Sequence, residues 1–186
     1  TGGGLASEAN ITGPAAGDLL GFSVAALGDV DGDGYNDVVI GAQGDDTAGE
    51  RAGAAWIWYG GGRETGTAIA SDVAVQLLGV ETGDAAGYGV AGVGDLDADG
   101  YDDLMIGAKY ALDDAGVTYL LYGAASAWAD GTDLASADAT FIGDDDDAYV
   151  GERFSMTSAG DMDGDGAADL AMGAYDSDRG ATEGGA

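Results

Sequence analysis

The 186-residue sequence contains no cysteine, no histidine and only one proline. Without cysteine the chain has no disulfide framework, and without cysteine or histidine it can form neither a Ser-His-Asp nor a Cys-His catalytic arrangement. Basic residues are scarce as well, at 5 against 35 acidic residues, which gives a formal charge of −30. A surface this acidic does not attract nucleic acid or anionic membranes. We therefore expect a protein that is not an enzyme and binds no nucleic acid.

Long apolar runs are also missing, and no stretch of 18 apolar residues occurs. We therefore expect no transmembrane helix and no membrane insertion. Hydrophobic residues make up 46% of the chain, which is too many for a disordered protein. The 37 glycines follow no collagen period, so they indicate many tight turns.

The most informative feature is an acidic motif, D-x-D-x-D-G-x-x-D, which begins at Asp29, Asp95 and Asp161 and so recurs every 66 residues. Four carboxylates within nine residues repel one another unless a cation neutralises them. Calcium takes six to eight oxygen ligands at irregular geometry, whereas magnesium requires a near-octahedral shell. The glycine at position 6 permits the sharp turn of such a loop. The motif predicts three calcium sites, and three copies in one register disfavour the alternative of solvated acidic turns.

We expect each ion to be held by the four aspartate side chains and by the backbone carbonyl of position 7. The predicted ligands are Asp29, Asp31, Asp33, Tyr35 and Asp37 for the first ion, Asp95, Asp97, Asp99, Tyr101 and Asp103 for the second, and Asp161, Asp163, Asp165, Ala167 and Asp169 for the third.

The flanking sequences distinguish these loops from the helix-flanked EF-hand, which needs a bidentate glutamate at position 12. Position 12 is Ile40, Ile106 or Met172. The flanks are short apolar runs bounded by glycine, which is typical of strands. Each calcium loop therefore connects the two strands of a β-hairpin. A Gly-Ala pair follows each second strand, and we expect a tight turn there (Gly41-Ala42, Gly107-Ala108 and Gly173-Ala174).

The repeat predicts an all-β fold of β-propeller blades with four antiparallel strands each, because four short strands in about 66 residues are typical of a blade. The chain provides about 2.8 such units, with a calcium loop in the first hairpin of each. We assign residues 1–13 to the last strand of a preceding blade, 14–79 and 80–143 to two blade units, and 144–186 to an incomplete third unit.

These residues resemble the FG-GAP repeats of integrin α-subunits and their microbial relatives. The resemblance rests on the aspartate loops, the Gly-Ala pairs and an aromatic residue before each first strand, namely Phe22, Tyr88 and Phe154. Serine follows Phe22 and Phe154 where the family has glycine, and no Gly-Ala pair is followed by proline. The resemblance implies calcium sites on one face of a propeller, usually of seven blades, and no integrin ligand site.

We therefore predict a calcium-binding structural or adhesive module located outside the cell or at its surface. The alternatives are a carbohydrate-binding, lectin-like propeller and a non-catalytic domain of a larger secreted enzyme. The expected partners are other blades, from a longer polypeptide or from neighbouring copies that self-assemble through open strand edges, and a protein or glycan ligand. Asn10-Ile11-Thr12 is an N-glycosylation sequon, with an ordinary strand residue as the alternative.

Overall fold

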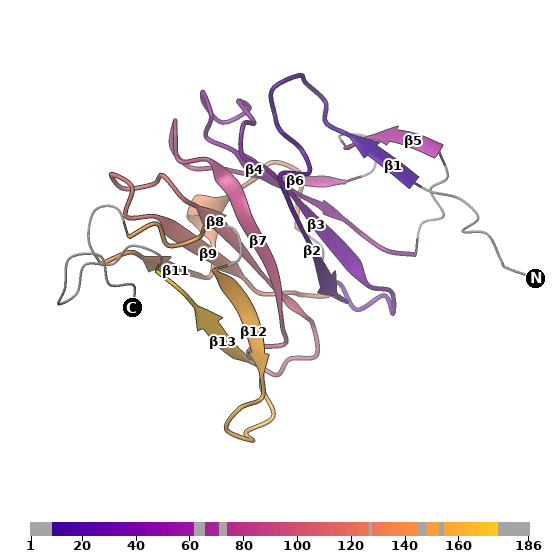
Figure 1. The fold of residues 1–186 in the computed structure, drawn as a ribbon. Coiled ribbons are helices and arrows are strands. Elements are labelled where there is room, and N and C mark those ends of the chain that lie inside the picture. The colour runs from indigo at the N-terminus through magenta and orange to yellow at the C-terminus, as the bar shows by residue number, and fades with distance from the viewer. Residues whose placement is uncertain are drawn as a thin grey trace, which may run out of the picture.

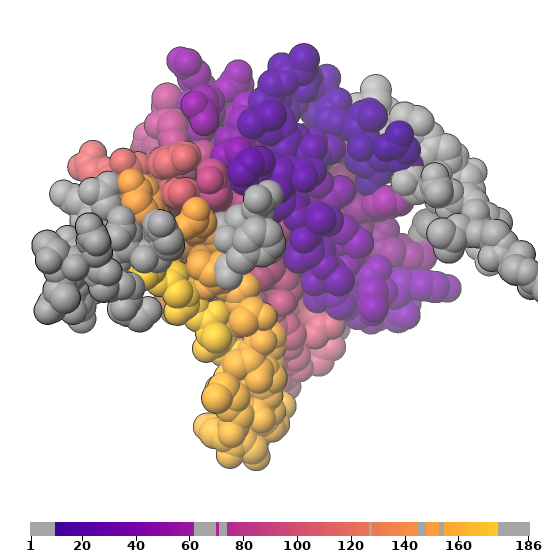
Figure 2. Space-filling model, in the orientation of Figure 1, coloured from indigo at the N-terminus to yellow at the C-terminus, as the bar shows by residue number. Residues whose placement is uncertain are grey.

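The computed structural model describes residues 9–61, 66–70, 74–126, 128–144, 148–152 and 155–174. These residues form two sheets, each with four antiparallel strands and the first with a fifth, parallel strand at its edge, and a third hairpin; the three follow one another along the chain and lie side by side (Figure 1). The third hairpin projects from the lower edge of the space-filling view (Figure 2). The all-β fold and the four-strand blades expected from the repeat are confirmed. The predicted unit boundaries at residues 13, 79 and 143 stay predictions.

The first sheet, in the order of its strands along the chain, contains β2 (Ser23–Gly28), β3 (Asp37–Ala42), β4 (Ala54–Trp58) and β6 (Val75–Leu78). The second sheet repeats this antiparallel order with β7 (Ala86–Gly94), β8 (Asp103–Ala108), β9 (Val117–Leu121) and β11 (Ala139–Ile142). The third hairpin consists of β12 (Met156–Gly160) and β13 (Asp169–Met172).

Two short parallel pairings complete the described structure. β1 (Ala9–Thr12) pairs with β5 (Gly66–Ile69), a strand inserted between β4 and β6. β10 (Thr132–Asp133) pairs with the outer edge of the first sheet at β6 and leads into a short 3-10 helix, η1 (Leu134–Ser136). β10 therefore ties the second unit to the last strand of the first.

The main hydrophobic core lies between the first two sheets. Val39, Ile57 and Leu77 of the first sheet are fully buried in one cluster with Leu104 and Ile106 of the second. Every residue of β8 is buried, because the second sheet is covered by the first on one face and by the third hairpin on the other. β3 instead alternates between buried and half-buried residues over most of its length. One face of the first sheet is thus less covered.

The Gly-Ala pairs differ from the turn expected from the sequence. Gly41-Ala42 and Gly107-Ala108 are the last residues of β3 and β8 and remain paired with the neighbouring strands. A Cβ on Gly41 would overlap the carbonyl oxygen of Gly87 in the next blade, and one on Gly107 would overlap that of Gly151. These residues are small because the backbone of the following blade crosses them.

A cation surrounded by aromatic rings joins the second unit to the third. Lys109 Nζ lies 4.9 Å from the ring centre of Tyr88 and 4.8 Å from that of Tyr149. It donates a 2.9 Å hydrogen bond to Glu152. Burial by itself lowers the pKa of Lys109, but the hydrogen bond and charge of Glu152 outweigh it, so the pKa is raised. The predicted aromatic position Phe154 lies outside the described residues.

Candidate metal sites

The three aspartate loops are placed by the hairpins β2–β3, β7–β8 and β12–β13, and they lie at the same end of the molecule (Figure 1). The ladder of each hairpin shifts register just before its loop. A glycine with positive φ ends each first strand (Gly28, Gly94 and Gly160), and another occupies position 6 of each loop (Gly34, Gly100 and Gly166). The sharp turn predicted at position 6 is therefore present in all three copies.

Backbone N–H groups hold the first aspartate of each loop. Oδ1 of Asp29 accepts hydrogen bonds from the N–H groups of Gly32 and Asp33, and Oδ2 accepts one from Gly34, at 2.8–3.0 Å. Asp95 and Asp161 accept the same bonds from positions 5 and 6 of their loops. The carboxylates at positions 3 and 5 likewise accept an N–H two residues ahead in each copy. The carboxylates thus point into the loop instead of spreading into solvent.

The closing aspartates of the first two loops are part of the core. Asp37 and Asp103 are both 0% exposed. Asp37 accepts hydrogen bonds from the N–H groups of Val30 at 2.9 Å and Gly60 at 2.7 Å, and Asp103 accepts equivalent ones from Leu96 and Gly123. These bonds tie each loop to the end of the third strand of its sheet.

Burial raises the pKa of both closing aspartates. For Asp37 the two backbone hydrogen bonds oppose this rise, while the charges of Asp31 and Asp33 add to it. For Asp103 burial and the charges of Asp97 and Asp95 raise the pKa to about 6, against the lowering effect of its two hydrogen bonds. A bound divalent cation would remove this penalty, because it stabilises the ionised form.

In each loop three aspartates bring ligand atoms within 4.8 Å of one another. They are Asp29, Asp31 and Asp33 in the first loop, Asp95, Asp97 and Asp99 in the second, and Asp161, Asp163 and Asp169 in the third. A hard, all-oxygen donor set at this spacing fits calcium. The remaining predicted side chains, Asp37, Asp103 and Asp165, lie outside these groups, and the ligand roles of the carbonyls of Tyr35, Tyr101 and Ala167 stay predictions.

One contact between the loops that the motif did not reveal involves Asp102, at position 8 of the second loop. Its carboxylate accepts a hydrogen bond from the N–H of Asp29 in the first loop at 2.9 Å. Position 8 is Asn36 in the first loop and Ala168 in the third, so a polar residue in two of the three copies was the available signal. Asn10 of the predicted sequon is exposed at β1, and its glycosylation stays a prediction.

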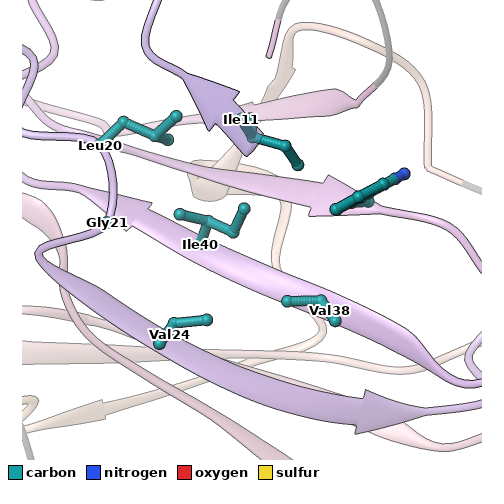
Figure 3. A pocket seen from close by; sticks show the side chains of 7 residues that line it. Ile11, Leu20, Gly21, Val24, Val38 and Ile40 are labelled. Atoms are coloured by element: carbon teal, nitrogen blue, oxygen red, sulfur yellow. The ribbon is translucent and has the colours of Figure 1, made fainter. Parts of the chain in front are cut away.

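A second candidate feature is an apolar groove of about 330 Å³ on the less covered face of the first sheet. Figure 3 shows the side chains of Val24 on β2 and of Val38 and Ile40 on β3 facing this space, with Ile11 and Leu20 at its border. Trp58 also lines it. Val24, the second residue of the edge strand β2, is 66% exposed.

The repeat shows what normally covers such a face. One repeat later, Val38 and Ile40 correspond to Leu104 and Ile106, which are fully buried against the first sheet. The groove of the first sheet therefore corresponds to the surface of the second sheet on which the first sheet packs.

Comparisons with known proteins agree with the repeat. The sequence model of the FG-GAP repeat matches residues 20–58 and 86–121. Integrin alpha-PS2 of Drosophila melanogaster is 31% identical over 182 residues, which cover 94% of this chain and 13% of that protein. Integrin alpha pat-2 of Caenorhabditis elegans is 32% identical over 104 residues, or 55% of this chain and 8% of that protein. The chain thus spans a small part of the length of these relatives.

Among the described residues, no helix has the length and apolar character needed to cross a membrane.

Proposed function

Because the FG-GAP repeat model matches two segments of the chain and integrin alpha-PS2 is similar over 94% of it, we propose that the chain is a calcium-stabilised, non-catalytic propeller module of an extracellular structural or adhesive protein. The observation that supports this most directly is the arrangement of the three loops. Each loop brings ligand atoms of three aspartates within 4.8 Å of one another, and the three loops lie at one end of the molecule.

Bound calcium would supply charge neutralisation at each loop. The chain carries a formal charge of −30, and repulsion between the clustered carboxylates opposes their close approach. The protein contributes the orientation of the ligands, because backbone N–H groups donate to the carboxylates at positions 1, 3 and 5. Calcium sites outside the cell commonly bind at about 10⁻⁴–10⁻³ M, which suits the concentration there.

The ions would stabilise the packing of blades as well as the loops themselves. Asp37 and Asp103 connect the loops to the third strand of each sheet through Gly60 and Gly123. Gly123 is followed by Ala124, whose N–H donates to the carbonyl of Val30 in the first loop, so a loop fixed by an ion would also fix part of the contact between the first two units.

We further propose that another blade covers the apolar groove of the first sheet. This blade belongs either to a longer polypeptide or to a neighbouring copy of the chain. Sedimentation of the isolated chain in calcium distinguishes the two, because copies that cover one another associate as the concentration rises. Replacing Val24 by lysine places a charge in the groove and should abolish that association. A monomer at all concentrations supports the longer polypeptide.

Thermal unfolding tests the calcium proposal. At about 10–100 times the dissociation constant each ion adds about 1.4–2.7 kcal/mol, so three ions add about 4–8 kcal/mol. For a chain of this length we expect the melting temperature to rise by about 10–30 °C between EDTA and excess calcium. Magnesium at the same concentration should give a much smaller rise.

The matched control for this experiment is the triple variant Asp31→Asn, Asp97→Asn and Asp163→Asn, which retains the shape of the loops and loses one ligand charge in each. Its melting temperature should be nearly the same in EDTA and in calcium. If the original chain melts at the same temperature in both solutions, calcium does not stabilise it and the proposal is wrong.

A further inference from the structure

The first two aspartate loops are joined by a reciprocal pair of hydrogen bonds. The N–H of Asp29 donates to Oδ2 of Asp102 at 2.9 Å, and the N–H of Asp102 donates to the carbonyl of Asp29 at 3.1 Å. Asp29 is the first predicted ligand of the first loop, and Asp102 directly precedes Asp103, the last predicted ligand of the second. The two loops therefore share a contact that includes backbone groups of both.

The contact around this pair is close. A Cβ on Gly28 would overlap the Asp102 carboxylate, and one on Gly32 would lie 2.5 Å from the ring of Tyr101. The N–H of Ala124, which follows β9, donates to the carbonyl of Val30 at 3.0 Å. Several groups of the second unit thus hold residues 28–32 of the first loop in place.

The next junction along the chain provides an internal comparison. The N–H of Ala168 donates to the carbonyl of Asp95 at 2.9 Å, which reproduces the backbone bond between Asp102 and Asp29. Alanine has no side-chain acceptor, so the second half of the reciprocal pair is missing there. Of the two junctions, only the first connects its loops through a carboxylate.

We propose that Asp102 is a positioning residue that couples calcium binding at the first and second loops. This inference rests on the proposed calcium function. An ion at the second loop would order the backbone of that loop, including Asp102 beside the predicted carbonyl ligand Tyr101, and the Asp102 carboxylate then holds the backbone of Asp29 in the geometry that the first ion needs. The first ion has less conformational freedom left to remove, so it binds more tightly. Coupling is reciprocal, and an ion at the first loop strengthens binding at the second.

The test compares calcium affinity at the first loop with the second loop intact and disabled. The full chain carries Asp163→Asn, which disables the third loop, and calcium is titrated while the amide resonance of Gly34 is followed by NMR. With Asp102 present, adding Asp97→Asn should weaken binding at the first loop about five-fold or more, within the usual range of coupling energies. With Asp102→Ala, the same change should weaken it less than about two-fold.

The conservative variant separates the hydrogen bond from the charge. Asp102→Asn keeps an oxygen that accepts the Asp29 N–H, so we expect it to retain the coupling seen with Asp102. The inference is overturned if Asp97→Asn weakens calcium binding at the first loop equally with Asp102 and with Asp102→Ala. It is also overturned if Asp102→Asn abolishes this effect. Ala168→Asp supplies the missing acceptor and should introduce coupling between the second and third loops.

Two controls keep the outcomes distinct. The melting temperature of each variant in EDTA shows whether the fold is intact before calcium is added. If no loop binds calcium, the proposed function fails and the inference fails with it. If the loops bind calcium independently, only the inference fails.

Discussion

The carboxylate of Asp37 accepts a 2.7 Å hydrogen bond from the N–H of Gly60, which lies just beyond the end of β4. Asp37 also accepts a hydrogen bond from Val30 and is fully buried. The residue that closes the first acidic loop is thus also a structural element of the sheet. Because Asp37 holds the sheet through these hydrogen bonds, its contribution to the free energy of unfolding can be measured in the absence of calcium.

Replacing Asp37 by alanine should lower the free energy of unfolding by about 2–6 kcal/mol in EDTA. The change leaves two N–H groups without their acceptor, at about 1–3 kcal/mol each. Urea denaturation measures the loss. Asp33→Ala is the control, because Asp33 is exposed and accepts a hydrogen bond only within its own loop. Equal losses in the two variants would show that the buried bonds do not stabilise the sheet.

Replacing Ala98 by glycine should stabilise the chain by about 0.5–1 kcal/mol, because relief of about 1–2 kcal/mol of strain is partly offset by the greater entropy of glycine in the unfolded chain. Ala98 has φ of 60°, a left-handed conformation that is unfavourable for a residue with a Cβ. The same loop position holds Gly32 and Gly164 in the other copies, also at positive φ. Gly164→Ala, at a position with nothing within 4 Å of the added Cβ, should cause a loss of similar size. A rise in the urea midpoint for one variant and a fall for the other would confirm this.

The two equivalent isoleucines, Ile106 and Ile40, should respond differently to truncation. Ile106 is fully buried between the sheets, so Ile106→Ala should lower the free energy of unfolding by about 2–5 kcal/mol. Ile40 lines the apolar groove and is half-buried, so Ile40→Ala should cause less than half that loss at protein concentrations where the chain is monomeric. Similar losses would show that both positions are equally covered.

Alkaline denaturation should depend on Tyr119. Burial raises its pKa to about 12, with the charges of Asp84, Asp133 and Glu81 adding to the rise. Because this exceeds the ordinary value of 10.0, the unfolded chain loses the proton first. The contribution of protonated Tyr119 to the stability of the fold is complete below the ordinary pKa of 10.0 and is lost as the pH rises through the pKa of Tyr119 in the folded chain. Urea midpoints measured across this interval should therefore fall less in Tyr119→Phe than in the original chain.

The control for the alkaline series is Tyr35→Phe, because Tyr35 is 59% exposed. Its urea midpoints should follow those of the original chain. If Tyr119→Phe loses stability as steeply as this control, ionisation of Tyr119 does not contribute to the alkaline unfolding.

The sequence predicted those parts of the fold that repeat. Three aspartate loops in one register identify three hairpins, and the apolar runs beside Asp29 and Asp95 locate the strands that flank them. Glycine at position 6 predicted a turn that needs positive φ, and Gly34 has φ of 91°. These features depend on neighbouring residues, and for that reason a single sequence was sufficient to find them.

The sequence did not predict contacts between units. The pairing of β1 with β5 and of β10 with β6 joins segments that are far apart in the chain and carry no distinctive pattern. The sequence suggested tight turns at the Gly-Ala pairs, because small residues are common in turns. Gly41 is small for another reason, which the sequence does not show: the backbone of the next blade crosses it. The contact of Asp102 with Asp29 was missed for the same reason, since position 8 has no role within its own loop.

The bond from position 8 of one loop to position 1 of the loop before it has a consequence for the shape of a longer array. The two junctions of this chain use the same backbone donor and acceptor, at 3.1 Å and 2.9 Å. A contact repeated in this way helps to place each blade against the next, beside the crossing of Gly41 and Gly107 by the following backbone. A substitution that altered this bond at one junction would change how well a ring of blades can close.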